Sequence, residues 1–230
     1  MSAQADDVEQ IGVFRGLPQS SLEDCAARAV TRYLAKGEAI FHQGDKPVRL
    51  HALASGWVRI MQAGADGELS VIRFVGPGEL FGAFAIFTAG GYPADAHAAA
   101  ESIELSWSEA HLRELLERYP SIAVNLLTVA ARRLGELQER VREISTQPAE
   151  QRIANALLRL ARKGGEQHAD GHVDILSPLV RKDIAAVSRT TLHTASRVMS
   201  AWERAGIVVS RRGLISINLL TKLQRIADGV

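Results

Sequence analysis

The chain has 230 residues, of which 47% are hydrophobic and 23% are charged, a balance typical of folded globular proteins. No apolar run reaches the roughly eighteen residues that a membrane-spanning helix needs, and the polar, acidic N-terminus predicts no secretory signal. Cys25 is the single cysteine, which excludes an internal disulfide and a multi-cysteine iron–sulfur cluster. We therefore expect a cytoplasmic protein of two modest domains with no membrane partner.

The charge is divided unevenly along the chain, although the net charge is only +1. Residues 1–147 contain 14 Lys and Arg against 19 Asp and Glu, a net of −5, whereas residues 148–230 contain 13 against 7, a net of +6. A basic C-terminal part beside an acidic remainder favours contact between the C-terminal part and nucleic acid. Ordinary fluctuation of charge along a sequence is the alternative.

The first third of the chain predicts short helices followed by a β-rich domain. Pro18 begins a helical stretch, and from Tyr33 to Trp107 short β-forming runs alternate with glycine turns every eight to twelve residues or so. Asp66 and Gly67 lie between two such runs and predict a hairpin turn. This spacing predicts a small antiparallel barrel or sandwich.

After Pro120 the pattern becomes helical and carries a narrow apolar seam. Its members are separated alternately by four and three residues, with charged residues on either side: Ala123, Leu127, Ala130, Leu134, Leu137, Val141 and Ile144. This heptad spacing predicts a dimerisation helix that pairs with its copy. Packing of the same residues against the chain's own barrel is the alternative.

Pro148 breaks this helix and is expected to be the first residue of the next one, from Ala149 to Arg162. A polar loop with His168 and His172 follows, and then a short strand from Val173 to Leu176. We place the boundaries of a sensor domain at residues 1–119, of the dimerisation helix at 120–146 and of a DNA-binding domain at 147–230.

Two short helices separated by a tight break follow from about residue 179. Leu179, Ile184 and Val187 form the apolar face of the first, and Thr190 or Thr191 caps the second. The second has an apolar face of Leu192, Ala195, Val198, Met199 and Trp202 and an opposite face of His193, Thr194, Ser196, Arg197 and Ser200. This pattern predicts a helix-turn-helix whose polar face enters the major groove of double-stranded DNA.

The polar face carries the side chains that reading of bases requires. Arg197 can donate to both O6 and N7 of guanine, and Ser196 and His193 can make shorter contacts to bases or phosphate. The N–H groups at the start of the helix, near Thr190 and Thr191, favour a phosphate oxygen, and Arg189 adds positive charge there.

A β-hairpin is predicted directly after the second helix. Apolar runs at Gly206–Ser210 and Leu214–Ile217 flank Arg211 and Arg212. Two arginines at a turn serve solubility in most proteins, but after a helix-turn-helix they predict a wing on the phosphate backbone.

These residues, in this order, resemble the CRP/FNR family of dimeric bacterial regulators. The resemblance implies an α+β chain with an N-terminal β-roll of the cyclic-nucleotide-binding type, a long dimerisation helix and a C-terminal winged helix. The stretch TTLHTASR at residues 190–197, with SGWVR at 55–59, is most similar to the nitric-oxide-responsive Nnr-type regulators. Ser196 and Arg197 fall where the family reads a TTG-type half-site. His193 replaces the commoner glutamate, and Arg189 replaces the usual turn glycine, at a cost of ~1 kcal/mol or with a different turn.

The resemblance also implies what the sensor domain binds. Ala83 stands where cyclic-AMP-binding members have a glutamate, and Pro93 and Ala94 replace their arginine–serine pair, so no tight cyclic AMP binding is expected. An apolar effector pocket is predicted instead, lined by Phe74, Phe81, Phe84, Ile86, Phe87 and Tyr92.

The resemblance implies nitric oxide sensing through haem as a hypothesis for this pocket. The candidate axial ligands are His42, His51, His97 and His111. For each histidine, a surface or packing role is the alternative.

The sequence therefore predicts a homodimeric transcription regulator gated by an effector other than cyclic AMP, with RNA polymerase as a partner if it activates. The alternative is a sensor module that regulates a partner protein without DNA. No enzyme is expected, since we find no metal-ligand cluster, no nucleophile beside a base and no phosphate-binding glycine loop.

Overall fold

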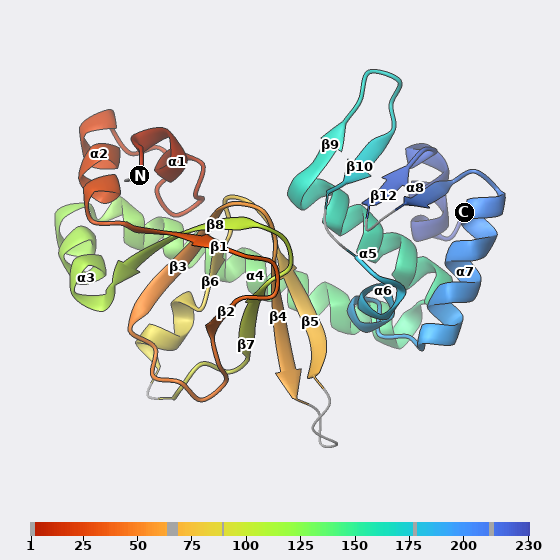
Figure 1. Ribbon diagram of the computed structural model, residues 1–230, viewed down its shortest axis with the longest axis horizontal. Coiled ribbons are helices and arrows are strands. Elements are labelled where there is room, and N and C mark those ends of the chain that lie inside the picture. Colours follow the sequence, from red (N-terminus) through yellow and green to blue (C-terminus); the bar gives the residue numbers. More distant parts are fainter. Residues whose placement is uncertain (1–2, 64–68, 89, 177–178, 212–213) are drawn as a thin grey trace. The chain divides into compact units, whose positions relative to one another are not determined.

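We describe a computed structural model of the chain over residues 3–63, 69–88, 90–176, 179–211 and 214–230 (Figure 1). The turn predicted at Asp66 and Gly67, and Arg212 of the predicted wing, lie outside these residues. The chain divides into two compact units, which we describe separately. The N-terminal unit comprises residues 1–69 and 74–136, and the C-terminal unit comprises residues 70–73 and 137–230.

Two four-stranded sheets form the β-roll that the glycine-turn spacing predicted. One sheet has the order β1-β8-β3-β6 and the other β2-β7-β4-β5. The strands are β1 (Val30–Leu34), β2 (Ala39–Phe41), β3 (Arg49–Ser55), β4 (Val58–Ala63), β5 (Leu69–Val75), β6 (Leu80–Phe81), β7 (Asp95–Ala98) and β8 (Ser102–Ser108). β8 pairs antiparallel with both β1 and β3, which fixes it in the interior of its sheet.

Short helices flank the roll and close one of its two apolar cores. They are α1 (Ala5–Glu9), α2 (Gln19–Ala27), the 3-10 helix η1 (Ala83–Phe87) and α3 (Glu109–Arg118). Trp107 on β8 is fully buried there, packs its ring 4.8 Å from that of Phe14, and donates through Nε1 to the carbonyl of Cys25 at 2.8 Å. This contact ties α2 to the sheet.

A single helix of 26 residues, α4 (Ser121–Thr146), follows the roll, as the pattern after Pro120 predicted. At 1.5 Å per residue it is roughly 39 Å long. Ile122 and Leu126 in its first turns are buried in the core of the N-terminal unit.

In its described residues, the C-terminal unit contains the end of α4, four further helices and a sheet of order β11-β12-β10-β9. Its elements are α5 (Ala149–Gly164), β9 (Gly165–Gln167), β10 (Val173–Ile175), α6 (Arg181–Val187), α7 (Leu192–Arg204), β11 (Val208–Arg211), β12 (Leu214–Ile217) and α8 (Leu220–Asp228). The sequence predicted Pro148 as the first residue of α5. It is instead the N-cap, and the helix begins at Ala149. α5 buries Ile153, Leu157 and Leu160 on one face, which forms the centre of this unit.

No helix in the described ranges is both long and apolar enough to cross a membrane.

Candidate nucleic-acid interface

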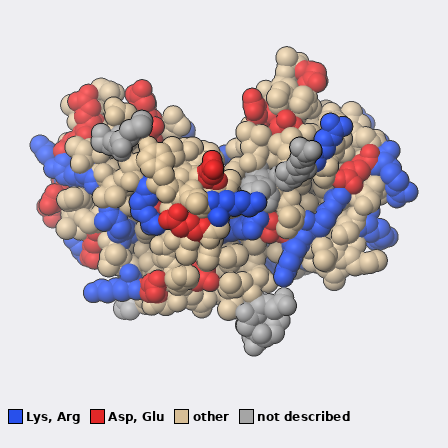
Figure 2. All heavy atoms as spheres, viewed as in Figure 1, with Lys and Arg blue, Asp and Glu red and all other residues tan. Residues whose placement is uncertain are grey.

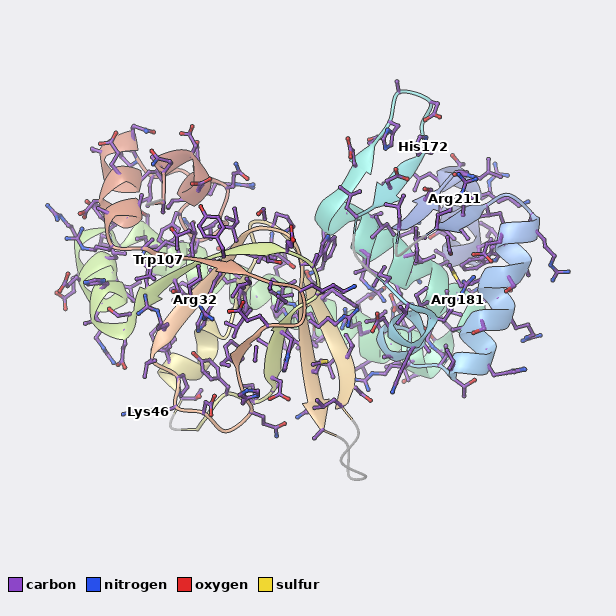
Figure 3. All side chains as sticks on the ribbon, viewed as in Figure 1. Arg32, Lys46, Trp107, His172, Arg181 and Arg211 are labelled. Carbon is purple, nitrogen blue, oxygen red and sulfur yellow. The ribbon has the colours of Figure 1, made fainter. Side chains whose placement is uncertain are left out.

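α6 and α7 form the predicted helix-turn-helix, and a charge pair joins their far ends. Ala185 on α6 and Ala195 on α7 are both buried, and their small side chains allow the two helices to approach closely. Nη2 of Arg181, which is labelled in Figure 3, donates to Oε1 of Glu203 at 2.7 Å and so links the first residue of α6 to the last turn of α7. The pair resists rotation of one helix against the other.

The turn between the helices is built around a residue in the left-handed conformation. For Arg189 in place of the usual glycine, the sequence allowed either a strained left-handed residue or a different turn. Its φ of 52° lies in the left-handed region, so the strained alternative holds. Arg152 on α5 holds the turn, since its Nε donates to the carbonyl of Ser188 at 3.0 Å and its Nη2 to the carbonyl of Arg189 at 3.1 Å. Sequence analysis did not identify Arg152, because the contact joins residues 37 positions apart.

Thr191 begins α7 as an N-cap. Its hydroxyl oxygen accepts from the backbone N–H of Thr194 at 3.1 Å, which satisfies one of the donors that a helix start leaves open. Of the two caps that the sequence allowed, the structure therefore uses Thr191. Thr190 precedes the cap and is half-buried.

The two faces of α7 separate cleanly, with one exception. Ala195, Val198, Met199 and Trp202 are buried as predicted, whereas Leu192 is 52% exposed. Leu192 was assigned to the apolar face in error, because the first residue of a helix lies beyond the core that the later turns cover. His193, Arg197 and Ser200 are exposed, and Thr194 and Ser196 are half-buried. The polar face is thus open to a ligand.

β11 and β12 form the hairpin predicted after α7. They pair antiparallel from Val208 opposite Ile217 to Arg211 opposite Leu214, and Arg211 is exposed at the end of its strand. Lys and Arg side chains reach the surface of the C-terminal unit in the view of Figure 2. The hairpin therefore carries at least one cation at the position expected of a wing.

The predicted seam on α4 is exposed in the single chain. The side chains of Leu127, Leu134, Leu137, Val141 and Ile144 are between 46% and 71% exposed, and Ala123 is exposed while Ala130 is half-buried. Leu127 and Leu134, which belong to the same unit as the barrel, do not pack against it, contrary to the alternative that the sequence left open for these residues. Ile122 and Leu126, each one position before a seam residue, pack into the core of the N-terminal unit instead.

A buried polar network lies inside the roll. Nδ1 of His51 bonds to Oε1 of Glu104, and Nε2 of His51 lies 3.0 Å from the hydroxyl of Tyr92. Glu104 is fully buried, and Nη1 of Arg32 lies 3.3 Å from its second oxygen. Burial raises the pKa of Tyr92, so its hydroxyl stays protonated and donates to the carbonyl of Arg49 at 3.3 Å. Sequence analysis did not find this network, because its members lie on three separate strands and a loop, far apart in the sequence.

The residues predicted to line an effector pocket do not all come together. Phe81 and Tyr92 share one core with Phe41, whose ring stacks on Tyr92 at 3.8 Å between centroids. Phe74 is buried elsewhere, at an edge-on contact with Trp57. Phe87 is 52% exposed, Ile86 packs against the core around Trp107, and the side chain of Phe84 lies outside the described residues.

Side chains fill the space around Phe81 and Tyr92. Gly82 has a φ of 65°, and a Cβ built on it would lie 2.9 Å from the ring of Tyr92 and 3.2 Å from that of His51. Only a glycine fits between these rings. Ala83 and Ala94 are buried beside these rings in sequence.

Two family models match the chain. The cyclic nucleotide-binding domain matches residues 31–119, and the Crp-like helix-turn-helix domain matches residues 151–226. The cyclic AMP receptor protein of Thermus thermophilus is 31% identical over 95% of this chain and 97% of its own length. The chain belongs to the CRP/FNR family of transcription regulators.

Other members of the family agree with this assignment. The CRP-like cAMP-activated global transcriptional regulator of Mycobacterium tuberculosis is 26% identical over 85% of this chain and 87% of its own length. The crystal structure of the Thermus thermophilus catabolite activator protein matches with a TM-score of 0.54 at 30% identity, covering 95% of this chain and 99% of that one. FixK2 of Bradyrhizobium japonicum shares the fold, with a TM-score of 0.73 at 21% identity over 86% of this chain and 96% of that one.

Membership settles the broad class of the protein. CRP/FNR proteins bind DNA through the C-terminal domain, typically as dimers, and are transcription regulators and not enzymes. The predicted fold, a β-roll of the cyclic-nucleotide-binding type followed by a long helix and a helix-turn-helix, is confirmed.

Proposed function

We propose that the chain is a homodimeric regulator that reads a palindromic, TTG-like operator with α7. The observation that carries this proposal is the exposure of Arg197 and His193 on the face of α7 opposite Ala195 and Met199. An arginine on the open face of a recognition helix can donate to O6 and N7 of one guanine. Ser196 beside it is placed for a shorter contact.

The surroundings of α7 support contacts to the DNA backbone. The first N–H groups of the helix, at Leu192 and His193, have no partner within the helix and favour a phosphate oxygen, with Arg189 adjacent. Thr190, Thr191 and Thr194 carry hydroxyl groups at the same helix start. Arg211, with Arg212 as its neighbour in sequence, is proposed to contact the phosphates from the wing.

The exposed seam on α4 supports pairing with a second copy. Leucines that are 46% to 71% exposed at heptad spacing are covered when two such helices pair. Pairing would place the two copies of α7 in successive major grooves, roughly 34 Å apart. We accordingly assign residues 1–119 to sensing, 120–146 to dimerisation and 147–230 to DNA binding.

Fluorescence anisotropy with a labelled duplex tests this function. We expect the full chain to bind a TTG-type palindrome at least roughly a thousand times more tightly than a scrambled duplex at the same salt concentration. Equal affinity for both duplexes would contradict sequence reading. Sedimentation equilibrium of the free protein tests the dimer independently.

The effector of this regulator is proposed to differ from cyclic AMP. The relatives named above are cyclic AMP receptors, but Ala83 and Ala94 offer neither a carboxylate for the ribose nor a donor for the cyclic phosphate. The rings of Phe41, Phe81 and Tyr92 pack together in the roll instead. Titration calorimetry with cyclic AMP checks this, and a micromolar dissociation constant would contradict it.

Nitric oxide is the effector we propose, on the similarity of residues 190–197 to the Nnr-type regulators. Haem bound through His51 does not fit the roll, because both ring nitrogens of His51 are engaged by Glu104 and Tyr92. Nδ1 of His111 lies 3.3 Å from the carbonyl of Arg28, a contact that does not engage Nε2, so His42, His97 and His111 stay candidates. Absorption spectra of freshly purified protein with and without nitric oxide test the proposal. A cytoplasmic location and contact with RNA polymerase during activation belong to the same proposal.

A further inference from the structure

The β9–β10 hairpin gathers polar side chains on one face. Asp174 pairs with Glu166 across the strands, and the N–H of His168 donates to the carbonyl of His172 at 3.0 Å. Because side chains alternate between faces in a strand, His168, His172 and Asp174 share one side of the hairpin. Val173 and Ile175 point to the other side and are buried.

A three-residue turn brings the two histidines together. Gly171 has a φ of 87°, and its N–H donates to the carbonyl of His168 at 2.9 Å. The imidazole rings of His168 and His172 then stack with centroids 4.0 Å apart at an interplanar angle of 10° (Figure 3 labels His172). The turn thus holds two nitrogen ligands side by side.

The carboxylate of Asp174 faces both rings. Its Oδ2 lies 3.2 Å from Nε2 of His168, and its Oδ1 lies 3.9 Å from Nε2 of His172. Ligand atoms about 2.0–2.1 Å from a tetrahedral metal ion are about 3.4 Å apart, so the two distances bracket the required separation. All three ligand atoms lie within 4.8 Å of one another.

Two atoms of this group lack a hydrogen-bond partner among the described residues. Nε2 of His168 and Oδ1 of Asp174 are buried, and neither makes a hydrogen bond to any residue in the described part of the chain. Buried polar atoms of this kind are uncommon and are most simply explained by an ion or a water. Their separation of only a few ångströms favours one shared ligand.

A second carboxylate orients one of the histidines. Oδ1 of Asp170 bonds to Nδ1 of His172 and also accepts from the backbone N–H of His172 at 3.3 Å. An acceptor at Nδ1 favours the Nδ1–H tautomer of His172, which leaves Nε2 on the side of Asp174. A carboxylate behind a histidine in this way is a common feature of metal sites.

We propose that His168, His172 and Asp174 bind a divalent transition metal ion of the Zn²⁺ class, with Asp170 as the positioning residue of His172. Two imidazoles and one carboxylate suit Zn²⁺, Co²⁺ or Ni²⁺ and leave a fourth coordination position for water. The sequence alone placed both histidines in a polar loop and predicted no metal-ligand cluster. The strand register brings the ligands together.

β10, which carries Asp174, is also hydrogen-bonded to β12 of the wing. Asp174 pairs with Ser216 in that register. The ion would therefore lie one strand from the hairpin that carries Arg211, in the same sheet.

Titration of the full chain with Co²⁺ tests the site, because tetrahedral Co²⁺ gives strong visible absorption. A second group of possible ligands, His42, Asp95 and His97, lies in the roll. The double variant His42→Ala/His97→Ala removes Co²⁺ binding by this second group, and it serves as the parent protein for the further substitutions. We expect the parent to bind one Co²⁺ per chain and Zn²⁺ to displace it.

Substitutions in the β9–β10 hairpin then show which residues bind the ion. His168→Ala or His172→Ala in the parent should weaken Co²⁺ binding by on the order of 100-fold or more, and Asp170→Asn by about 10–100-fold. Asp170 is exposed at the turn, so its variant tests the site without loss of folding. His193→Ala, a histidine outside the hairpin, is the matched control and should bind as the parent does.

Two results would overturn the proposal. One is a parent that binds no Co²⁺ or Zn²⁺ at micromolar protein and metal. The other is a parent that binds one ion with an affinity that His168→Ala and His172→Ala leave unchanged.

Discussion

The guanidinium of Arg152 donates to the carbonyl of Arg189 and thereby joins α5 to the left-handed turn of the helix-turn-helix. The same side chain donates to the carbonyls of Ser188 and Gln147, at 3.0 and 2.6 Å. A left-handed residue other than glycine costs on the order of 1 kcal/mol or more. Three charge-assisted hydrogen bonds to one side chain offset that cost and hold α7 in place.

Replacement of Arg152 tests this relationship. We expect Arg152→Ala to lower the free energy of unfolding of the C-terminal unit by about 1–3 kcal/mol, because the carbonyls lose their donor. Urea denaturation measures the change. Arg162→Ala, an exposed arginine on the same helix, is the control and should change stability by less than about 0.5 kcal/mol. Equal effects of the two variants would remove the role we assign to Arg152.

The backbone of Arg189 and its charge should have separable effects. Arg189→Gly relieves the positive φ and should raise the free energy of unfolding by about 0.5–1 kcal/mol, part of the relief being offset by the flexibility of glycine in the unfolded chain. It should also weaken DNA binding, since a cation near the phosphates is lost. Arg189→Ala should weaken DNA binding equally without the gain in stability. A glycine variant that is less stable than the alanine variant would contradict this account.

Arg197 and Arg211 should affect DNA binding differently. Arg197→Ala should weaken binding to the operator by about 1–3 kcal/mol and relax specificity at one base pair. Arg211→Ala should weaken operator and scrambled DNA alike and reduce the slope of log K against log salt by about 1. Anisotropy titrations at several salt concentrations measure both quantities. An equal loss on both duplexes for Arg197→Ala would rule out base reading.

The seam on α4 predicts which substitutions weaken the dimer. Leu137→Glu should raise the dimer dissociation constant by on the order of 100-fold, because a dimer would bury an unpaired carboxylate. Gln138→Glu introduces the same charge one position off the seam and should leave the dimer intact. Sedimentation equilibrium distinguishes the two variants. A monomeric wild-type protein at micromolar concentration would contradict the pairing of α4.

Cys25 predicts a dependence of stability on pH. Burial raises the pKa of its thiol from 9.0 to about 11, so the folded state holds the proton more tightly than the unfolded state. The stabilisation is fully present below pH 9 and is lost as the pH rises through about 11, amounting to at most roughly 2–3 kcal/mol. The difference in unfolding free energy between wild type and Cys25→Ala, followed from pH 8 to 11, measures it. A constant difference across that range would show that folding does not raise the pKa of the Cys25 thiol.

Local patterns in the sequence were sufficient for the elements and their order. The heptad spacing from Ala123 to Ile144 predicted a long helix, and glycine turns predicted the roll, because periodicity and turn chemistry act over a few residues. The positions of Arg197 and Arg211 on open surfaces follow from the same local rules. Leu192 shows the limit of such rules, since the helix period cannot say where the core beneath a helix ends.

The polar residues of the β9–β10 hairpin could be predicted from the sequence only in part. Alternation of His168, Asp170, His172 and Asp174 along the chain places them on one side of a hairpin once its register is known. The sequence contains these residues at that spacing, but the position of the turn at Gly171 sets the register. A shift of one residue would separate His168 from His172.

The sequence alone determined the class of fold, the helix-turn-helix and the polar face of α7 that we propose meets DNA. Only the tertiary structure decided which distant groups meet: Arg152 with Arg189, and His51 with Glu104, 53 positions apart. The physical reason is that these contacts depend on how strands and helices pack. Packing is a property of the whole unit, and no local pattern records it.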